Sequence, residues 1–449
     1  MNKLSWKSKL SFGIGAFGKD AVYAIVSTFL MFYLTDVRMV APAFVGTLFL
    51  VARIWDAFND PFMGMVVDNT RSRWGKFRPW ILVGTILNAV VLIFLFLNID
   101  MAGSSYKIYC SIFYILWGMT YTVMDIPYWS MVPAMTDDEN ERSQISAIPR
   151  LFASFAWLVV GSFGLFFVAK LGNGNDMQGF SRFAIAISVI FVIASILTVI
   201  NVKEKVVTQN AEKTTVKQMI RVLFENDQVK VILGIALFFN VAYQLSNSFA
   251  LYYFSYVIGN KALFATYTGV AGVAQMVALA AFPKISEKIG RGKAFLLASF
   301  LPVVGFILLL LCGFILPGSI IMVGVCSAVV NIGIGFMLVL ITVMLADVVD
   351  YGEYKLGTRN ESILFSMQTF IVKFAGAFSG FVSGIGLTLI GYVPNEAQAP
   401  HTIIGMRIIM IALPALLSFL CFVIYKKGYR LTAEFCRKMM QELRTRKEQ

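Results

Sequence analysis

The chain has 449 residues, of which 58% are hydrophobic and only 14% are charged. Soluble globular proteins contain about 25% charged residues, so this composition excludes a soluble domain, a disordered chain and a disulfide scaffold. A net charge of +13 is often a sign of nucleic-acid binding. Here basic loops on the cytoplasmic side of a membrane protein explain it better, and we expect no nucleic-acid partner. The composition predicts an all-α protein with many membrane spans.

About twelve apolar stretches are long enough to cross a bilayer, which takes about 20 residues. They fall at about 12–34, 42–67, 79–98, 108–133, 149–170, 180–200, 230–257, 263–283, 294–316, 319–349, 361–391 and 403–425. An even number places both termini on one side of the membrane. Most of the 38 Lys and Arg residues then lie on the cytoplasmic side, so we expect the N- and C-termini inside.

The longest polar loop divides the chain into two related halves. The basic loops RSRWGKFRP and SEKIGRGK follow the second span of each half, and the acidic stretches TDDENER and DVVDYGEYK also match. Two related six-helix bundles are typical of a transporter. We expect an N-terminal bundle at 1–200, a cytoplasmic middle loop at 201–229, a C-terminal bundle at 230–427 and a basic cytoplasmic tail at 428–449. The tail resembles an amphipathic helix that a regulatory protein or anionic lipid could contact, although a solvated tail explains it as well.

Several ionisable residues lie inside the predicted spans, where each one costs several kcal/mol unless it is paired or hydrated. They are Lys19, Asp20, Arg53, Asp56, Asp60, Asp125, Arg150 and Lys373. Such a cluster indicates a function within the membrane.

Asp56 and Asp60 are four residues apart, so both project from one face of a helix. Two nearby carboxylates repel each other unless a cation or proton lies between them. Oxygen ligands suit hard cations, and Asn59 and Thr122 could add neutral oxygens, so we predict a Na⁺ site. The alternative is a salt-bridge cluster with Arg53 and Lys373 that only holds the helices together. Both interpretations can hold at once.

Tyr121, Asp125 and Trp129 form one stripe along the fourth span. A carboxylate accepts hydrogen bonds from sugar hydroxyls, and an aromatic ring covers the apolar face of a sugar. Trp129 alone would more often be an interfacial or core residue. Lys19, Asp20 and Arg150 would complete a polar wall that suits a polyol.

The segments that carry these residues resemble a known family. They are GAFGKD at 15–20, GTLFLVARIWDAFNDP at 46–61, TRSRWGKFRPW at 70–80, YILWGMTYTVMDIPYWSMVP at 114–133, FALYYFSYVIG at 249–259 and ADVVDYGEYK at 346–355. They are similar to the glycoside–pentoside–hexuronide:cation symporters of the major facilitator superfamily, and among these to the melibiose carriers. The resemblance extends from about residue 9 to 430.

The resemblance implies twelve transmembrane helices in two bundles and the uptake of a galactoside coupled to Na⁺, Li⁺ or H⁺. The implied sugar-binding residues are Lys19, Asp20, Tyr121, Asp125, Trp129, Arg150 and Gln368, with Lys373 close to both ligands. The implied cation-binding residues are Asp56, Asn59, Asp60 and Thr122. We further expect gating or ion-pair roles for Arg53, Arg142, Asp350 and Glu353.

Two positions depart from the melibiose carriers. Leu338 replaces a tryptophan near the sugar, and Ser27 replaces a tyrosine. Both changes enlarge the expected pocket, so a larger or differently linked glycoside such as raffinose or a β-galactoside becomes possible.

The sequence therefore predicts a symporter of the bacterial inner membrane and not an enzyme, since it has a single histidine and no nucleotide-binding loop. We expect no cofactor other than the co-transported ion. Within the transporters, a pentoside, a hexuronide or an amphipathic lipid is the alternative substrate. Outside them, the alternatives are a membrane sugar sensor that does not transport, and a channel, which would not need paired carboxylates beside a sugar stripe.

Overall fold

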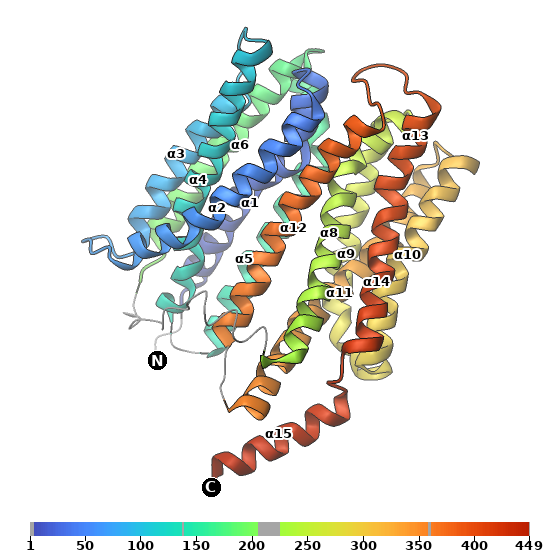
Figure 1. Cartoon of the computed structure of the whole chain (residues 1–449). Coiled ribbons are helices and arrows are strands. Elements are labelled where there is room, and N and C mark those ends of the chain that lie inside the picture. Colours follow the sequence, from blue (N-terminus) through green and yellow to red (C-terminus); the bar gives the residue numbers. More distant parts are fainter. Residues whose placement is uncertain (1–3, 137–138, 205–224, 358–360, 449) are drawn as a thin grey trace. The chain divides into compact units, whose positions relative to one another are not determined.

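A computed structural model describes residues 4–136, 139–204, 225–357 and 361–448 (Figure 1). These ranges form helices and connecting loops, without a β-strand. The chain divides into two compact units, residues 1–211 with 393–396 and residues 212–392 with 397–449. Most of the predicted middle loop at 201–229 lies outside the described residues.

The described residues of the first unit form six long helices. They are α1 (Trp6–Phe32), which the π-helix η1 (Tyr33–Val37) extends, then α2 (Pro42–Asp68), α3 (Arg78–Leu95), α4 (Gly103–Met135), α5 (Glu139–Gly172) and α6 (Asp176–Asn201). Side-chain oxygens cap several starts, because the first N–H groups of a helix have no partner inside it. Ser5 accepts from the backbone N–H of Ser8 at 3.1 Å, and Asn175 accepts from Gln178 at 3.0 Å.

The second unit repeats this order. It contains α8 (Asp227–Tyr252) with the π-helix η2 (Tyr253–Val257), α9 (Leu263–Ile289), α10 (Arg291–Ile315), α11 (Ile320–Leu356) and α12 (Glu361–Leu389). A last composite helix follows, built from α13 (Pro400–Arg407), η3 (Ile408–Ala412) and α14 (Leu413–Gly428), and α15 (Ala433–Glu448) ends the described chain. The predicted twelve-helix fold is confirmed.

Some helix ends differ from the expected spans. We predicted a loop before a span at 149, but α5 begins at Glu139; we ended another span at 349, but α11 continues to Leu356. Both extensions are polar, so hydropathy alone begins the first of these helices too late and ends the second too early.

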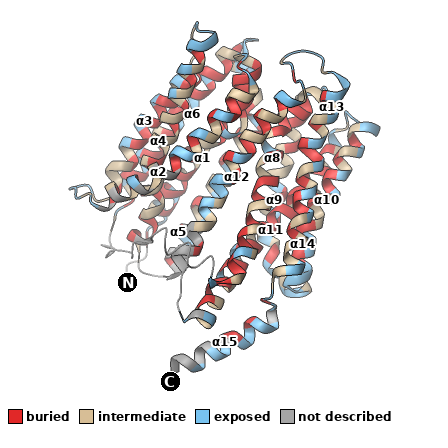
Figure 2. Cartoon of the chain, viewed as in Figure 1, coloured by how far each residue is buried: buried red, intermediate tan, exposed pale blue. Residues whose placement is uncertain are grey.

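Ten helices in the described ranges are long and apolar enough to cross a membrane. The remaining two long helices, α2 and α4, carry Asp56, Asp60 and Asp125. Figure 2 shows buried residues within each bundle and exposed residues on its outside. Large apolar side chains such as Leu389 and Ile321 are 81% and 78% exposed. Such exposure is expected of side chains that face lipid.

The same pairs of helices pack together in both units. In the first unit α1 packs against α5 and α6, α3 against α4 and α6, and α2 against α4. In the second unit α8 packs against α12 and α14, α10 against α11 and α14, and α9 against α11. The internal duplication that the repeated loops indicate therefore extends to the packing.

The repeated basic loops each turn at a glycine with positive φ. Gly75 has φ of 105° and Gly290 has φ of 83°, a region that favours glycine because it has no Cβ. A Cβ on Gly75 would also collide with the carboxylate of Glu204, which accepts from the backbone N–H of Lys76 at 2.6 Å and of Phe77 at 2.9 Å. The glycine allows this carboxylate to cap the start of α3.

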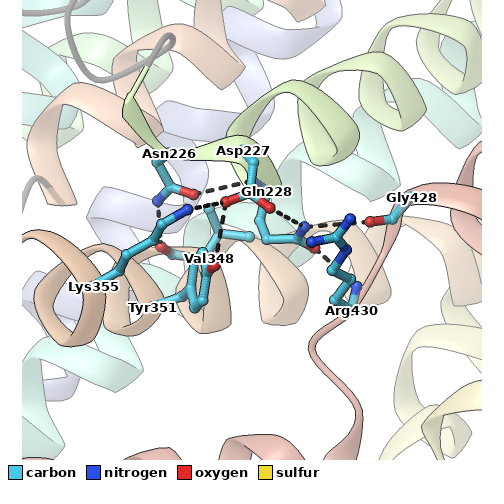
Figure 3. A network of polar contacts seen from close by, with 8 residues as sticks. All are labelled: Asn226, Asp227, Gln228, Val348, Tyr351, Lys355, Gly428 and Arg430. Carbon is cyan, nitrogen blue, oxygen red and sulfur yellow. Dashed lines mark hydrogen bonds and ion pairs between the residues drawn. The ribbon is translucent and has the colours of Figure 1, made fainter.

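Polar contacts join the first and last helices of the second unit (Figure 3). Gln228 at the start of α8 donates from Nε2 to the carbonyl of Gly428 at 3.3 Å and accepts from the N–H of Arg430 at 2.9 Å. Beside it, Asp227 pairs with Lys355 of α11 at 2.6 Å and accepts from the hydroxyl of Tyr351 at 3.2 Å. The first and last helix ends of this unit therefore meet at one end of the bundle, as an even number of spans requires.

The tail forms α15, which packs on the end of α11. The ring of Phe435 lies 6.2 Å from Tyr351 and 6.3 Å from Tyr354, and Cys436 and Met439 are buried. Burial, together with the nearby carboxylate of Asp347, raises the pKa of the Cys436 thiol to about 11. The thiol is therefore protonated at neutral pH and slow to react with maleimides.

Candidate functional site

The ammonium of Lys19 is the centre of a polar cluster in the first unit. Lys19 lies on α1 with its side chain 4% exposed, and its Nζ is 3.1 Å from Asp20 Oδ2 and 2.8 Å from Asp125 Oδ1 on α4. The same nitrogen donates to the hydroxyl of Tyr121 at 3.4 Å. The structure thus brings together the predicted sugar-binding residues of the first and fourth spans.

Aromatic rings enclose this ammonium. Nζ lies 5.1 Å from the ring centroid of Trp129, 5.6 Å from Tyr128 and 5.7 Å from Tyr121, distances at which a cation is attracted to a ring face. Tyr128 is held in place because its hydroxyl donates to the carbonyl of Phe12. The predicted stripe of Tyr121, Asp125 and Trp129 therefore faces α1.

The two carboxylates differ from the ammonium in their access to solvent. The side chain of Asp20 is 16% exposed and that of Asp125 is 29% exposed. Each contacts Lys19 Nζ through one oxygen. Lys19 fixes the orientation of both groups from the buried side, and the arrangement leaves hydrogen-bond acceptors on the accessible side.

The predicted cation residues lie on α2 and α4. Asp56 is buried and its Oδ2 pairs with Arg53 at 2.9 Å, while Asp60 accepts from the hydroxyl of Thr122 at 2.9 Å. The amide nitrogen of Asn59 is buried and has no hydrogen-bond partner among the described residues. The ion pair of the alternative interpretation is thus present between Arg53 and Asp56, next to groups that could bind a cation.

Among the described residues, no group of three or more His, Cys, Asp or Glu side chains lies close enough together to hold a metal ion. A bound Na⁺ would therefore need neutral oxygens in addition to the carboxylates. Thr122, already in contact with Asp60, is the first candidate. The roles of Asp56, Asn59, Asp60 and Thr122 stay predictions.

Tyr23 on α1 connects the two groups, and sequence reasoning missed it. Its hydroxyl accepts from Arg53 Nη2 at 3.1 Å, and its ring lies 5.3 Å from that of Tyr121, which contacts Lys19. Trp117 and Trp157 lie 5.7 and 6.1 Å from the same ring. The available signal was an aromatic residue one turn beyond Lys19 and Asp20.

The other predicted residues lie elsewhere. Arg150 is exposed on α5, and in the second unit Gln368 is half-buried and Lys373 is exposed on α12. Asp350 and Glu353 are half-buried near the end of α11, and the side chain of Arg142 lies outside the described residues. Ser27 is exposed on α1 and Leu338 is half-buried on α11. The binding and gating roles assigned to these positions stay predictions.

The model of the family described as MFS/sugar transport protein matches residues 11–433. The chain belongs to this family. It is a multi-pass protein of the inner membrane and a sugar symporter of the major facilitator superfamily, as the sequence predicted. Its relatives are transporters and not enzymes.

Two curated relatives match along almost the whole chain. The isoprimeverose transporter of Lactiplantibacillus pentosus is 32% identical over 431 residues, which cover 95% of this chain and 89% of that protein. The raffinose carrier protein of Pediococcus pentosaceus is 30% identical over 465 residues, which cover 97% of this chain and 71% of the carrier.

A solved structure of the D-xylose-proton symporter has the same fold. It matches with a TM-score of 0.68 at 13% sequence identity, over 95% of this chain and 99% of that chain. At this identity the match concerns the fold alone. The resemblance to melibiose carriers in particular stays a prediction.

Proposed function

We propose that this symporter couples the uptake of a glycoside, of the galactoside class, to Na⁺, Li⁺ or H⁺. The observation that carries the proposal is the Lys19 cluster. The buried ammonium fixes the orientation of two carboxylates, which keep hydrogen-bond acceptors on their accessible side. The ring centroid of Trp129 lies 5.1 Å from the nitrogen of that ammonium. Carboxylates accept hydrogen bonds from sugar hydroxyls, and the ring offers an apolar face to the sugar.

In this mechanism the cation binds first, at Asp56 and Asp60, and reduces the repulsion between their charges. Sugar then binds at Asp20 and Asp125 with its apolar face on Trp129. Coupling is local, because Thr122 of the cation site and Asp125 of the sugar site lie one turn apart on α4. A second connection between the two sites runs from Arg53 through Tyr23 to Tyr121. Linkage requires that each ligand strengthens the binding of the other by the same factor. The loaded bundles then rearrange to open on the other side.

Uptake of radiolabelled melibiose, raffinose, isoprimeverose and phenyl glucuronide, in cells that lack their own carriers, tests this function. We expect at least one glycoside to accumulate above its external concentration with Na⁺ or Li⁺, or with a proton gradient, and to lose accumulation when that gradient is abolished. Uptake of the glucuronide alone would show that the substrate is a hexuronide and not a galactoside. Binding without counterflow would indicate a sensor, and equilibration without an ion requirement would indicate a channel.

Gly118 on α4 supplies a further prediction. A Cβ at this position would lie 2.9 Å from Asp56 Oδ1, whereas a Cβ at Gly64 on α2 would have no atom within 4 Å. Because Arg53 already holds the other oxygen of Asp56, Gly118→Ala should displace the carboxylate. We expect the cation concentration for half-maximal uptake to rise about tenfold in Gly118→Ala and to stay within twofold of wild type in Gly64→Ala. Equal cation concentrations for half-maximal uptake in the two variants would show that Asp56 does not bind the cation.

A further inference from the structure

One segment of α4, residues 117–125, carries residues of both proposed sites. They are Gly118 next to Asp56, Tyr121 and Asp125 at Lys19, and Thr122 at Asp60. A change in the order of this segment therefore affects the sugar site and the cation site together. The neighbouring helix α3 carries none of the predicted ligand residues, but it contacts this segment at two places.

Asn88 on α3 holds the first of these places. It is fully buried, and its Nδ2 donates to the carbonyl of Trp117 at 2.8 Å and to the hydroxyl of Thr120 at 2.9 Å. A carbonyl has two lone pairs, so this bond adds to the one within the helix. The Thr120 hydroxyl in turn donates to the carbonyl of Leu116 at 2.8 Å. One amide thus fixes a turn of α4 from outside the helix.

Gly84, one turn earlier on α3, marks the second place. A Cβ at this position would lie 2.7 Å from the backbone nitrogen of Met124 and 2.9 Å from the backbone carbon of Val123. The two helix backbones are therefore in direct contact here. The two contact points on α4 lie on either side of Tyr121 and Thr122.

Helix α3 is itself fixed to α6 by buried polar contacts. The hydroxyl of Thr85 bonds to that of Ser195 at 3.0 Å, and the hydroxyl of Ser188 donates to the carbonyl of Ala89 at 3.3 Å. Thr85 is as buried as Asn88 and lies three residues away, but its bond goes to α6 instead of α4. It therefore offers a matched control for Asn88.

We propose that Asn88 is a positioning residue for coupling, which orders the α4 segment 117–125 before either ligand binds. This inference rests on the proposed function, because it concerns the sugar and cation sites assigned there. The first ligand to bind a mobile segment bears the entropic cost of ordering it, and the second ligand does not. By ordering the segment in advance, Asn88 strengthens the binding of each ligand alone and limits the factor by which one ligand strengthens the other.

Binding to Asn88→Ala distinguishes this role from a loss of stability. The affinities for melibiose and isoprimeverose are measured with and without the ion, Na⁺, Li⁺ or H⁺, that drives uptake. Without the ion we expect about fivefold weaker sugar binding, the factor for one neutral hydrogen bond. With saturating ion the affinity should stay within about twofold of wild type, because the ion has already ordered the segment. The coupling factor therefore rises in Asn88→Ala and keeps its wild-type value in Thr85→Val. An equal loss of affinity under both conditions would contradict the proposal.

Amide hydrogen exchange of the ligand-free protein tests the positioning without any ligand. We expect the amides of 117–125 to exchange about fivefold faster in Asn88→Ala and at the wild-type rate in Thr85→Val. Thr120→Val removes only the hydroxyl partner of Asn88 and should give a smaller increase, which keeps the test decisive if Asn88→Ala does not fold.

Unchanged exchange of this segment in the folded variants of Asn88 and Thr120, or an equal increase in Thr85→Val, would overturn the role of Asn88. If wild type binds neither sugar, the proposed function fails for these glycosides. Faster exchange of α4 in Asn88→Ala would then still support the positioning of the segment by α3.

Discussion

Lys19→Met should abolish sugar binding and also destabilise the protein. The variant leaves Asp20 and Asp125, both half-buried, without the buried ammonium that separates them. Removal of one partner from a buried ion pair costs about 3–5 kcal/mol. We expect a clear fall in the melting temperature of the purified protein and at least a hundredfold loss of sugar affinity.

A second variant separates the structural role of Lys19 from its binding role. Lys19→Met combined with Asp125→Asn removes one of the two like charges that Lys19→Met leaves unneutralised, so it should recover much of the melting temperature. Sugar affinity should stay low, because one of the two charged acceptors is gone and Lys19 no longer orients the other; hydrogen bonds to charged groups are worth about 1.5–3 kcal/mol. Asp125→Ala and Asp20→Ala alone should each weaken binding at least tenfold. Full affinity in the double variant would place the sugar elsewhere.

Asp60→Cys should remove cation-driven accumulation and leave sugar exchange intact. The change deletes a carboxylate of the predicted cation site, which Thr122 contacts at 2.9 Å, while the Lys19 cluster keeps all of its contacts. In vesicles we expect exchange of labelled for unlabelled sugar at a near-normal rate, without concentration above the external level.

Thr122→Val is the graded control for this prediction. It keeps the Asp60 carboxylate but removes the hydroxyl that bonds to it, so cation affinity should fall by a smaller factor and accumulation should persist at high cation concentration. Accumulation by Asp60→Cys that still responds to Na⁺ or to the proton gradient would show that Asp60 does not bind the coupling ion.

The sequence alone determined the class of protein and much of its site, because these depend on local properties. Hydropathy located the spans, since burial in lipid requires about 20 apolar residues in succession. Helical periodicity placed Tyr121, Asp125 and Trp129 on one face. The cost of charge in a membrane marked Lys19 and Asp56 as functional candidates. The repeated loops indicated a duplication that the helix packing confirms.

Only the tertiary structure decided which faces meet, because that depends on packing between helices far apart in the chain. It joined Lys19 to both Asp20 and Asp125, and it brought Tyr23 to Arg53. Arg150, by contrast, is exposed. Periodicity identifies residues that share a helix face, but the partner of that face is set by three-dimensional packing.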